Sequence, residues 1–119
     1  MAYLNINDGA IKMAIFEVDE DDFEEIKSQE LEKGNFVVLR FGSEMCDACQ
    51  AMEFELEELD ESMDNISILY IDCNESEELT NIYDIQMVPT VIVFDKDNQI
   101  IFRYEGVILC RDIQEIINK

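Results

Sequence analysis

Histidine and tryptophan are absent from this sequence of 119 residues, and proline occurs only once. Because there is no histidine, every mechanism that needs an imidazole base is excluded. Basic residues are also scarce: eight lysines and arginines stand against 29 aspartates and glutamates, which gives a formal charge of −21 at pH 7. Nucleic acids and anionic membrane surfaces are bound by clustered basic residues, so we expect neither as a partner. We interpret the charge as a source of solubility, with attraction to a basic partner protein as the alternative.

Long apolar stretches are missing as well. No run approaches the length of a membrane span, and the first residues lack the basic start and the apolar core of a secretory signal peptide. Four cysteines in a chain without these signals indicate a reducing cytoplasm, where a close cysteine pair cycles between its two redox states. The length is typical of one domain with an ordinary core, and the sequence contains no repeat, low-complexity tract or linker.

The middle of the chain changes its hydrophobic period at a pair of cysteines. An apolar run at residues 36–41 ends at Gly42, and Cys46 and Cys49 follow, separated by two residues. After the pair, apolar residues recur at positions i, i+4, i+7 and i+11, with acidic residues on the other faces. This pattern predicts a buried strand, a short loop and an amphipathic helix at about residues 48–63, with the cysteines at its first turn.

Shorter periodic blocks predict the elements on either side. Residues 19–33 are typical of a helix that begins at Asp19 as N-cap. Another helix is expected after Asn74, with Glu77 at the capping-box position and Ile82 on the inner face. The remaining predictions are strands at residues 13–16, 66–71, 90–94 and 100–104, a final helix at residues 110–118, and either an N-terminal extension or an edge hairpin at residues 1–12. The order βαβαβαββα indicates parallel crossover units followed by a hairpin and a closing helix.

This order of elements resembles the thioredoxin family over residues 13–119, the expected domain. Three motifs carry the resemblance: the Cys46-Asp47-Ala48-Cys49 segment, the Val88-Pro89-Thr90 segment, and Gly106. The resemblance implies the thioredoxin fold, an α/β architecture with a central mixed sheet flanked by helices on both faces. It also implies that Cys46 and Cys49 are the catalytic pair of a thiol–disulfide oxidoreductase that reduces protein disulfides.

Further expectations follow from the same resemblance. The bond before Pro89 is expected to be cis, and Met45, Val88, Pro89 and Gly106 are expected to bind the substrate. A thioredoxin reductase is the expected electron donor, and the protein is expected to be a monomer without a cofactor. The alternative is a thioredoxin-fold binding or scaffold module with little general reductase activity. A metal site is not expected, because the spacing of the cysteines matches no familiar zinc or iron–sulfur pattern.

The spacing of the pair suits thiol chemistry. A thiolate is the nucleophile in disulfide exchange, and the N–H groups at a helix N-terminus stabilise negative charge. We therefore expect Cys46, nearer the helix end, to be exposed and to attack a substrate disulfide. Two intervening residues allow Cys49 to reach the sulfur of Cys46 and to resolve the mixed disulfide.

Arg40 departs from the family pattern, which commonly has a buried acidic residue at this place, six positions before the first cysteine. A buried guanidinium requires a carboxylate partner or a route to solvent. We favour a structural ion pair for Arg40. Tuning of the cysteines is the other interpretation.

Overall fold

The computed structural model describes residues 14–119, so the extension or edge hairpin predicted at residues 1–12 lies outside the described part. Helices and strands follow the predicted order, βαβαβαββα. In chain order they are β1 (Ile15–Val18), α1 (Phe23–Glu32), β2 (Phe36–Gly42), α2 (Asp47–Ser62), β3 (Ile66–Asp72), α3 (Glu77–Ile82), β4 (Thr90–Phe94), β5 (Ile100–Glu105) and α4 (Cys110–Ile117). None of these helices combines the length and the apolar character that crossing a bilayer requires.

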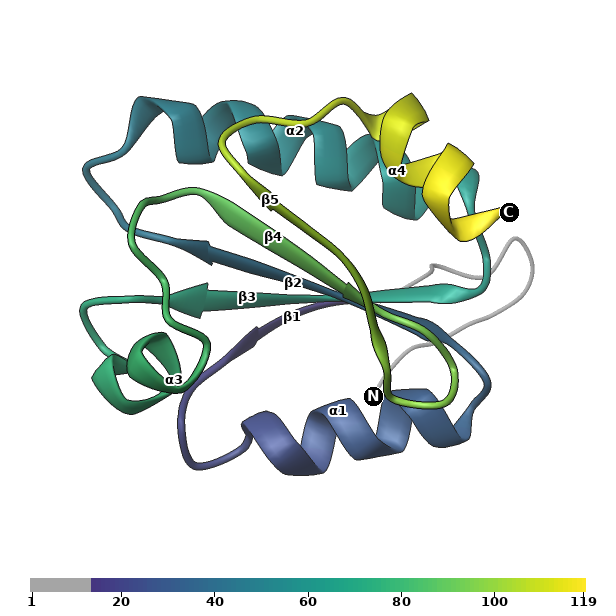
Figure 1. Cartoon of the computed structure of the whole chain (residues 1–119), viewed down its shortest axis with the longest axis horizontal. Coiled ribbons are helices and arrows are strands. Elements are labelled where there is room, and N and C mark those ends of the chain that lie inside the picture. Colours follow the sequence, from purple (N-terminus) through teal and green to yellow (C-terminus); the bar gives the residue numbers. More distant parts are fainter. Residues whose placement is uncertain (1–13) are drawn as a thin grey trace, which may run out of the picture.

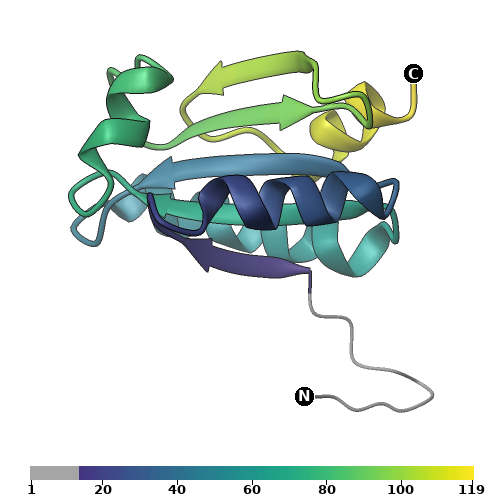
Figure 2. The same ribbon diagram turned by 90° about the horizontal axis from the view of Figure 1, so that it is seen from below.

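The five strands form one mixed sheet in the order β1-β3-β2-β4-β5 (Figure 2). Strands β1, β3 and β2 run parallel, whereas β4 pairs antiparallel with β2, and β5 pairs antiparallel with β4. Strand β2 is central, and all its residues after Phe36 are buried. A nearly continuous apolar strand is expected where helices cover both faces of a sheet. The predicted α/β architecture with parallel crossovers and a final hairpin is confirmed.

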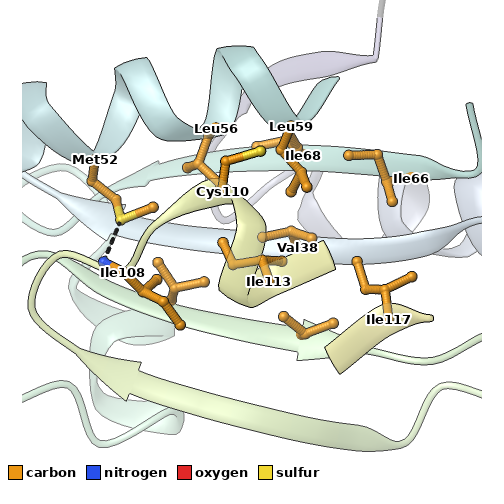
Figure 3. Close-up of a cluster of buried hydrophobic side chains, with 12 residues drawn as sticks. Val38, Met52, Leu56, Leu59, Ile66, Ile68, Ile108, Cys110, Ile113 and Ile117 are labelled. Atoms are coloured by element: carbon orange, nitrogen blue, oxygen red, sulfur yellow. Dashed lines mark hydrogen bonds between the residues drawn. The ribbon is translucent and has the colours of Figure 1, made fainter. Parts of the chain in front are cut away.

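Helices α2 and α4 cover one face of the sheet, and α1 and α3 cover the other (Figure 1). Alternate residues of β2 enter the two cores: Val38 faces α2 and α4, while Val37 and Leu39 face α1 and α3. The core under α2 and α4 contains several completely buried side chains, among them Met52 and Ile113 (Figure 3). Full burial of such a side chain contributes about 1.5–3 kcal/mol, so this packing fixes α2 on the sheet.

Helix α1 begins later than predicted. Its first residue is Phe23 and its N-cap is Asp22, so the assignment of Asp19 as N-cap is wrong. The Asp19 carboxylate instead accepts hydrogen bonds from the backbone N–H groups of Asp21 at 2.9 Å and Asp22 at 3.2 Å. Aspartate side chains compete with helix formation through such local bonds. The acidic segment therefore forms a turn before the helix.

Helix α3 also differs from its prediction. Asn74 precedes the helix without capping it, and the N-cap residue is Ser76, whose side chain makes no capping bond. The carboxylate of Glu20, from the segment between β1 and α1, accepts hydrogen bonds from two backbone N–H groups in the first turn of α3. Ile82 was predicted to face inward, but it is 66% exposed, whereas its neighbour Tyr83 packs against the core under α1 and α3. A partner distant in sequence thus replaces the predicted local cap.

Candidate redox site

Three connecting segments meet at one edge of the sheet. The cysteines follow the carboxyl end of β2, and because β4 is antiparallel to β2, the segment before β4 returns to the same edge. Strand β5 is antiparallel to β4, so its own end also lies there. In this register Phe41 is opposite Thr90, and Thr90 is opposite Glu105. The topology therefore brings Cys46, Pro89 and the residue after β5 together.

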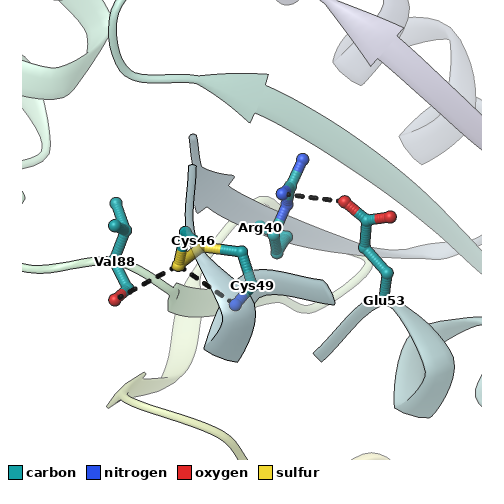
Figure 4. Close-up of polar contacts among 5 residues, drawn as sticks. All are labelled: Arg40, Cys46, Cys49, Glu53 and Val88. Atoms are coloured by element: carbon teal, nitrogen blue, oxygen red, sulfur yellow. Dashed lines mark hydrogen bonds and ion pairs between the residues drawn. A yellow bond between two sulfur atoms is a disulfide. The ribbon is translucent and has the colours of Figure 1, made fainter. Parts of the chain in front are cut away.

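Cys46 is the N-cap of α2, and it forms a disulfide with Cys49 one helical turn later, with 5.2 Å between the two Cα atoms (Figure 4). The backbone N–H of Cys49 donates a hydrogen bond to Cys46 Sγ at 3.1 Å, the position that a capping hydroxyl or carboxylate oxygen usually occupies. Cys46 is half-buried, whereas Cys49 is only 1% exposed. The helix end therefore stabilises negative charge on Cys46, the more accessible sulfur.

The Val88–Pro89 peptide bond is cis, as predicted, and its segment lies against the disulfide. The carbonyl oxygen of Val88 is 4.0 Å from Cys46 Sγ, a distance at which the Cys46 thiol of the reduced protein can donate to it (Figure 4). Gly106, which has a φ of 111° that favours glycine, donates its N–H to the carbonyl oxygen of Pro89 at 2.8 Å. Three predicted site residues are thus connected to Cys46 through the backbone. Gly106 bonds to Pro89, Pro89 follows Val88 in the chain, and Val88 contacts Cys46.

Apolar side chains stand exposed around the disulfide. Met45, directly before Cys46, is 96% exposed, and Met87 precedes the cis-proline segment at 47% exposed. Val107, which directly follows Gly106, is exposed as well. Exposed apolar residues grouped at one site are typical of an interaction surface. Met45 was predicted as a site residue, and Met87 was missed because its side chain gives no signal of its own in the sequence.

Arg40 lies behind the disulfide and is buried to all but 7% of its surface. Its Nη1 forms an ion pair with Glu53 Oε2 of α2 at 3.1 Å, and its guanidinium stacks on the ring of Tyr70 of β3 with Cζ 4.4 Å from the ring centroid. Its Nε is buried and has no hydrogen-bond partner in the part of the chain that the structure describes. The predicted carboxylate partner is therefore present, although one donor remains unused.

The environment of Arg40 also affects Tyr70. Burial raises the pKa of Tyr70 to about 12, and the Glu53 carboxylate adds to the increase, while the positive charge of Arg40 opposes it. The hydroxyl of Tyr70 is buried without a partner among the described residues. The phenol therefore stays neutral through the physiological pH range and gives Arg40 an uncharged aromatic surface.

A cavity of about 380 Å³ opens beside this ion pair. It is lined by Glu17, Val18, Arg40, Gly42, Ser43, Glu44, Glu53, Tyr70, Asp72 and Glu75. Arg40 is the one basic residue of this lining, against five carboxylates. The side of the cysteine pair that faces β1 and β3 is therefore strongly acidic.

The other two cysteines lie on opposite faces of the sheet. Cys73 packs against the core under α1 and α3, and Cys110 belongs to the core under α2 and α4. Burial raises the pKa of the Cys110 thiol, which keeps it neutral, although a hydrogen bond with Ser62 acts in the opposite direction. Across residues 14–119, no group of three or more histidine, cysteine or acidic side chains is placed to bind a metal ion.

Sequence reasoning predicted the residues in direct contact with the sulfurs better than those behind them. Glu53 was missed, although it lies at i+4 from Cys49 and so on the same face of α2, a signal that could have been used. Tyr70 could be found only from the register of β2 against β3, which places it opposite Arg40. Gly42, which lines the acidic cavity, was read only as the end of a strand.

A disulfide at the N-terminus of a helix, faced by a cis-proline on a mixed α/β sheet, defines a thiol–disulfide redox protein. The sequence model described as Thioredoxin matches residues 14–119. The chain belongs to the thioredoxin family, and with its Cys46–Cys49 pair it is a thiol–disulfide oxidoreductase.

Known relatives agree with this assignment. The chain is 33% identical over 87 residues to Thioredoxin-1 of Caenorhabditis elegans, which is 73% of each chain. It is 34% identical over 82 residues to the chloroplastic Thioredoxin Y2 of Arabidopsis thaliana, which is 68% of this chain and 48% of that protein. The crystal structure of the short form of thioredoxin f from spinach chloroplast is similar with a TM-score of 0.76 and 25% identity, over 89% of this chain and 96% of that one.

Proposed function

We propose that this protein reduces disulfides in other proteins, with Cys46 as the attacking cysteine and Cys49 as the resolving cysteine. The observation that carries the assignment of roles is the difference between the two sulfurs. Cys46 is half-buried and its Sγ accepts the hydrogen bond at the helix N-terminus, whereas Cys49 is buried. A thiolate that is both accessible and stabilised is the one that attacks.

The reaction proceeds in two exchanges. The Cys46 thiolate attacks one sulfur of the substrate disulfide, which forms a mixed disulfide and releases the other substrate sulfur as a thiolate. The Cys49 thiolate then attacks Cys46 Sγ, which forms the Cys46–Cys49 disulfide and releases the second substrate thiolate. Water protonates both released thiolates, so the substrate gains two electrons and the pair loses two.

The surface around Cys46 supports binding of an extended substrate segment. The carbonyl oxygen of Val88 lies close to Cys46 Sγ and is free to accept a hydrogen bond from a substrate backbone. Gly106 holds Pro89 in place through its backbone N–H, and Met45 offers an exposed apolar side chain. We assign substrate binding to these four residues, with Met45 in contact with apolar side chains that flank the substrate disulfide.

Return to the reduced state needs an outside electron donor, for which we propose a thioredoxin reductase. The chemistry of the pair requires no cofactor within the chain itself. A cycling pair functions in a reducing compartment, and we propose the cytoplasm and a monomeric state. The tuning role predicted for Arg40 belongs to the same proposal.

Reduction of insulin by dithiothreitol, followed as turbidity, tests the function. We expect the wild-type protein to accelerate the reaction and Cys46→Ser to be inactive. Cys73→Ser is the matched control, because it makes the same chemical change outside the site and should retain full activity. If the wild-type protein and Cys46→Ser are equally inert, the reductase assignment is wrong and the binding-module alternative is supported.

A further inference from the structure

Gly42 has no side chain, and the Arg40 guanidinium and Cys49 Sγ both lie close to the position that its Cβ would occupy. A Cβ at this position would overlap Arg40 Nη1 and would lie 2.9 Å from Arg40 Cζ and 3.2 Å from Cys49 Sγ. Of the three glycines among residues 14–119, only Gly34 and Gly106 have a positive φ, so the backbone conformation at position 42 does not require glycine. The absence of a side chain at Gly42 is therefore what allows the guanidinium and the buried sulfur to approach each other.

Two further contacts hold the guanidinium in this place. Glu53 binds Nη1 from α2, one helical turn after Cys49, and the ring of Tyr70 supports the guanidinium from β3. Figure 4 shows the Arg40 guanidinium with Glu53 beyond it and the Cys49 side chain on its other side. A long flexible side chain is thus fixed by contacts from two elements, with one donor of the guanidinium, Nε, still unused.

We propose that Arg40 is the charge partner of Cys49, so that the resolving cysteine reacts as a thiolate held by a guanidinium, with Gly42 admitting that group and Glu53 positioning it. The inference rests on the proposed function, because it concerns the second exchange of that reaction. In this step the Cys49 thiolate displaces the substrate thiolate from Cys46 Sγ, and the proton of the Cys49 thiol has already passed to water. Arg40 lowers the energy of that thiolate and transfers no proton.

The two cysteines differ in what stabilises their charge. Cys46 has the N–H of Cys49 and partial contact with water. Cys49 is buried, and burial without compensation disfavours a thiolate. The acidic lining of the neighbouring cavity disfavours it further, and its carboxylates are those of Glu17, Glu44, Glu53, Asp72 and Glu75. Arg40, the one cation of that lining, offsets both effects at Cys49.

Carbon NMR titration of the reduced protein, labelled at cysteine Cβ, tests the pairing residue by residue. We expect Arg40→Met to raise the pKa of Cys49 by about 1–2 units, the size of effect that an opposite charge at this range produces. Arg40→Lys should recover part of the shift, because it keeps the charge without the planar group. Lys96→Met is the control, since Lys96 lies over Phe36 at the other end of β2 and should leave Cys49 unchanged.

Two variants test separately the position of the Arg40 guanidinium and the charge beside it. Gly42→Ala keeps every charged group but displaces the guanidinium, so the pKa of Cys49 should rise as it does in Arg40→Met. The overlap is with the flexible end of Arg40, so this variant should fold. Glu53→Gln keeps a hydrogen-bonding group and removes an anion, so the pKa of Cys49 should fall. A pKa of Cys49 that is unchanged in both Arg40→Met and Gly42→Ala would overturn the pairing.

The titration tests the pairing of Arg40 with Cys49, and the insulin assay tests the reductase assignment, so either conclusion can be wrong without the other. A wild-type protein that is active in the assay, with a Cys49 pKa insensitive to Arg40, would overturn the pairing and leave the reductase assignment intact. A wild-type protein that is inert, with a Cys49 pKa that shifts as expected, would overturn the reductase assignment and support the pairing.

Discussion

Among residues 14–119 three charged side chains are buried, Lys27 and Glu30 on α1 and Arg40 beside the disulfide, and the surroundings of Glu30 and Arg40 differ. Glu30 is 5% exposed, and each of its oxygens has a partner: Oε1 accepts from the Ser67 hydroxyl at 2.6 Å, and Oε2 pairs with Lys33 Nζ at 2.8 Å. Arg40 is 7% exposed, has one ion pair, with Glu53, and keeps an unused donor.

The comparison indicates how a structural charge differs from a functional one. The Glu30 site is saturated, since its hydroxyl partner Ser67 also accepts a hydrogen bond from Asn35 Nδ2 at 3.1 Å. Such a closed network fixes the start of β3 against α1. At the Arg40 site, in contrast, one buried donor has no hydrogen-bond partner among the described residues, and the sulfur of Cys49 occupies the adjacent space. We therefore expect changes at Glu30 to affect stability and changes at Arg40 to affect thiol chemistry.

Removal of the Glu30 carboxylate should have the largest effect on stability. Glu30→Ala leaves the fully buried Ser67 hydroxyl without its acceptor, so the free energy of unfolding should fall by about 1–3 kcal/mol. Urea denaturation measures this change, and insulin reduction at a temperature where the variant is folded should equal that of the wild type. Glu30→Gln, which keeps an acceptor for Ser67, is the matched control and should lose less. Equal losses in both variants would contradict the hydrogen-bonding explanation.

Tyr70 should give the chain an alkaline dependence of stability. Its pKa is about 12 in the folded protein against 10.0 in the unfolded chain, so the folded state holds the phenol proton more tightly. The resulting stabilisation is complete below pH 10 and is lost as the pH rises from 10 through 12. Phenylalanine has no ionisable hydroxyl, so Tyr70→Phe does not lose this stabilisation. Its free energy of unfolding should therefore rise relative to that of the wild type as the pH increases from 10 to 12. A constant difference between the two proteins across it would contradict the burial of the phenol.

Arg40→Met should change the free energy of unfolding by less than about 1 kcal/mol. The carboxylate left behind, Glu53, is 37% exposed and can be hydrated, whereas an apolar side chain fills the buried part of the site. Urea denaturation of the oxidised form measures the change without a contribution from the thiols of Cys46 and Cys49. A loss as large as that of Glu30→Ala would place Arg40 among the structural charges.

Ser76 should show the smallest effect. Its hydroxyl is buried without a partner among the described residues. Ser76→Ala removes an unsatisfied group, so the free energy of unfolding should change by less than about 0.5 kcal/mol. Glu20→Ala is the contrasting variant, because it removes the carboxylate that caps α3 and should cost about 1 kcal/mol in the same denaturation experiment. A larger loss in Ser76→Ala than in Glu20→Ala would contradict the assignment of Glu20 as the group that caps α3.

The sequence predicted the elements whose apolar period is long and regular. Strand β2 and helix α2 are two such elements, and together they position Cys46 and Cys49. The start of α1 was predicted wrongly because the Asp19 carboxylate forms a turn with the backbone N–H groups that follow it. The start of α3 was predicted wrongly because the carboxylate that caps it, Glu20, is distant in sequence.

Contacts between neighbouring strands limited how much of the site could be predicted from the sequence. The need of Arg40 for a carboxylate followed from its position on a buried strand, but Glu53 was not identified as that partner, although its spacing from Cys49 indicates it. The contact with Tyr70 depends on strand register, and the space at Gly42 depends on how two side chains turn toward each other. Neither the contact with Tyr70 nor the space at Gly42 can be inferred from the order of residue types alone.

Trapping of the mixed disulfide tests the central claim most directly. Reduced Cys49→Ser and Cys46→Ser are each incubated with a disulfide-containing protein, and covalent complexes are measured by mass spectrometry without added reductant. The account predicts that Cys49→Ser accumulates a complex joined through Cys46, whereas Cys46→Ser accumulates little, because Cys49 is buried. A complex that forms equally through Cys49 would contradict the division of roles between the two sulfurs.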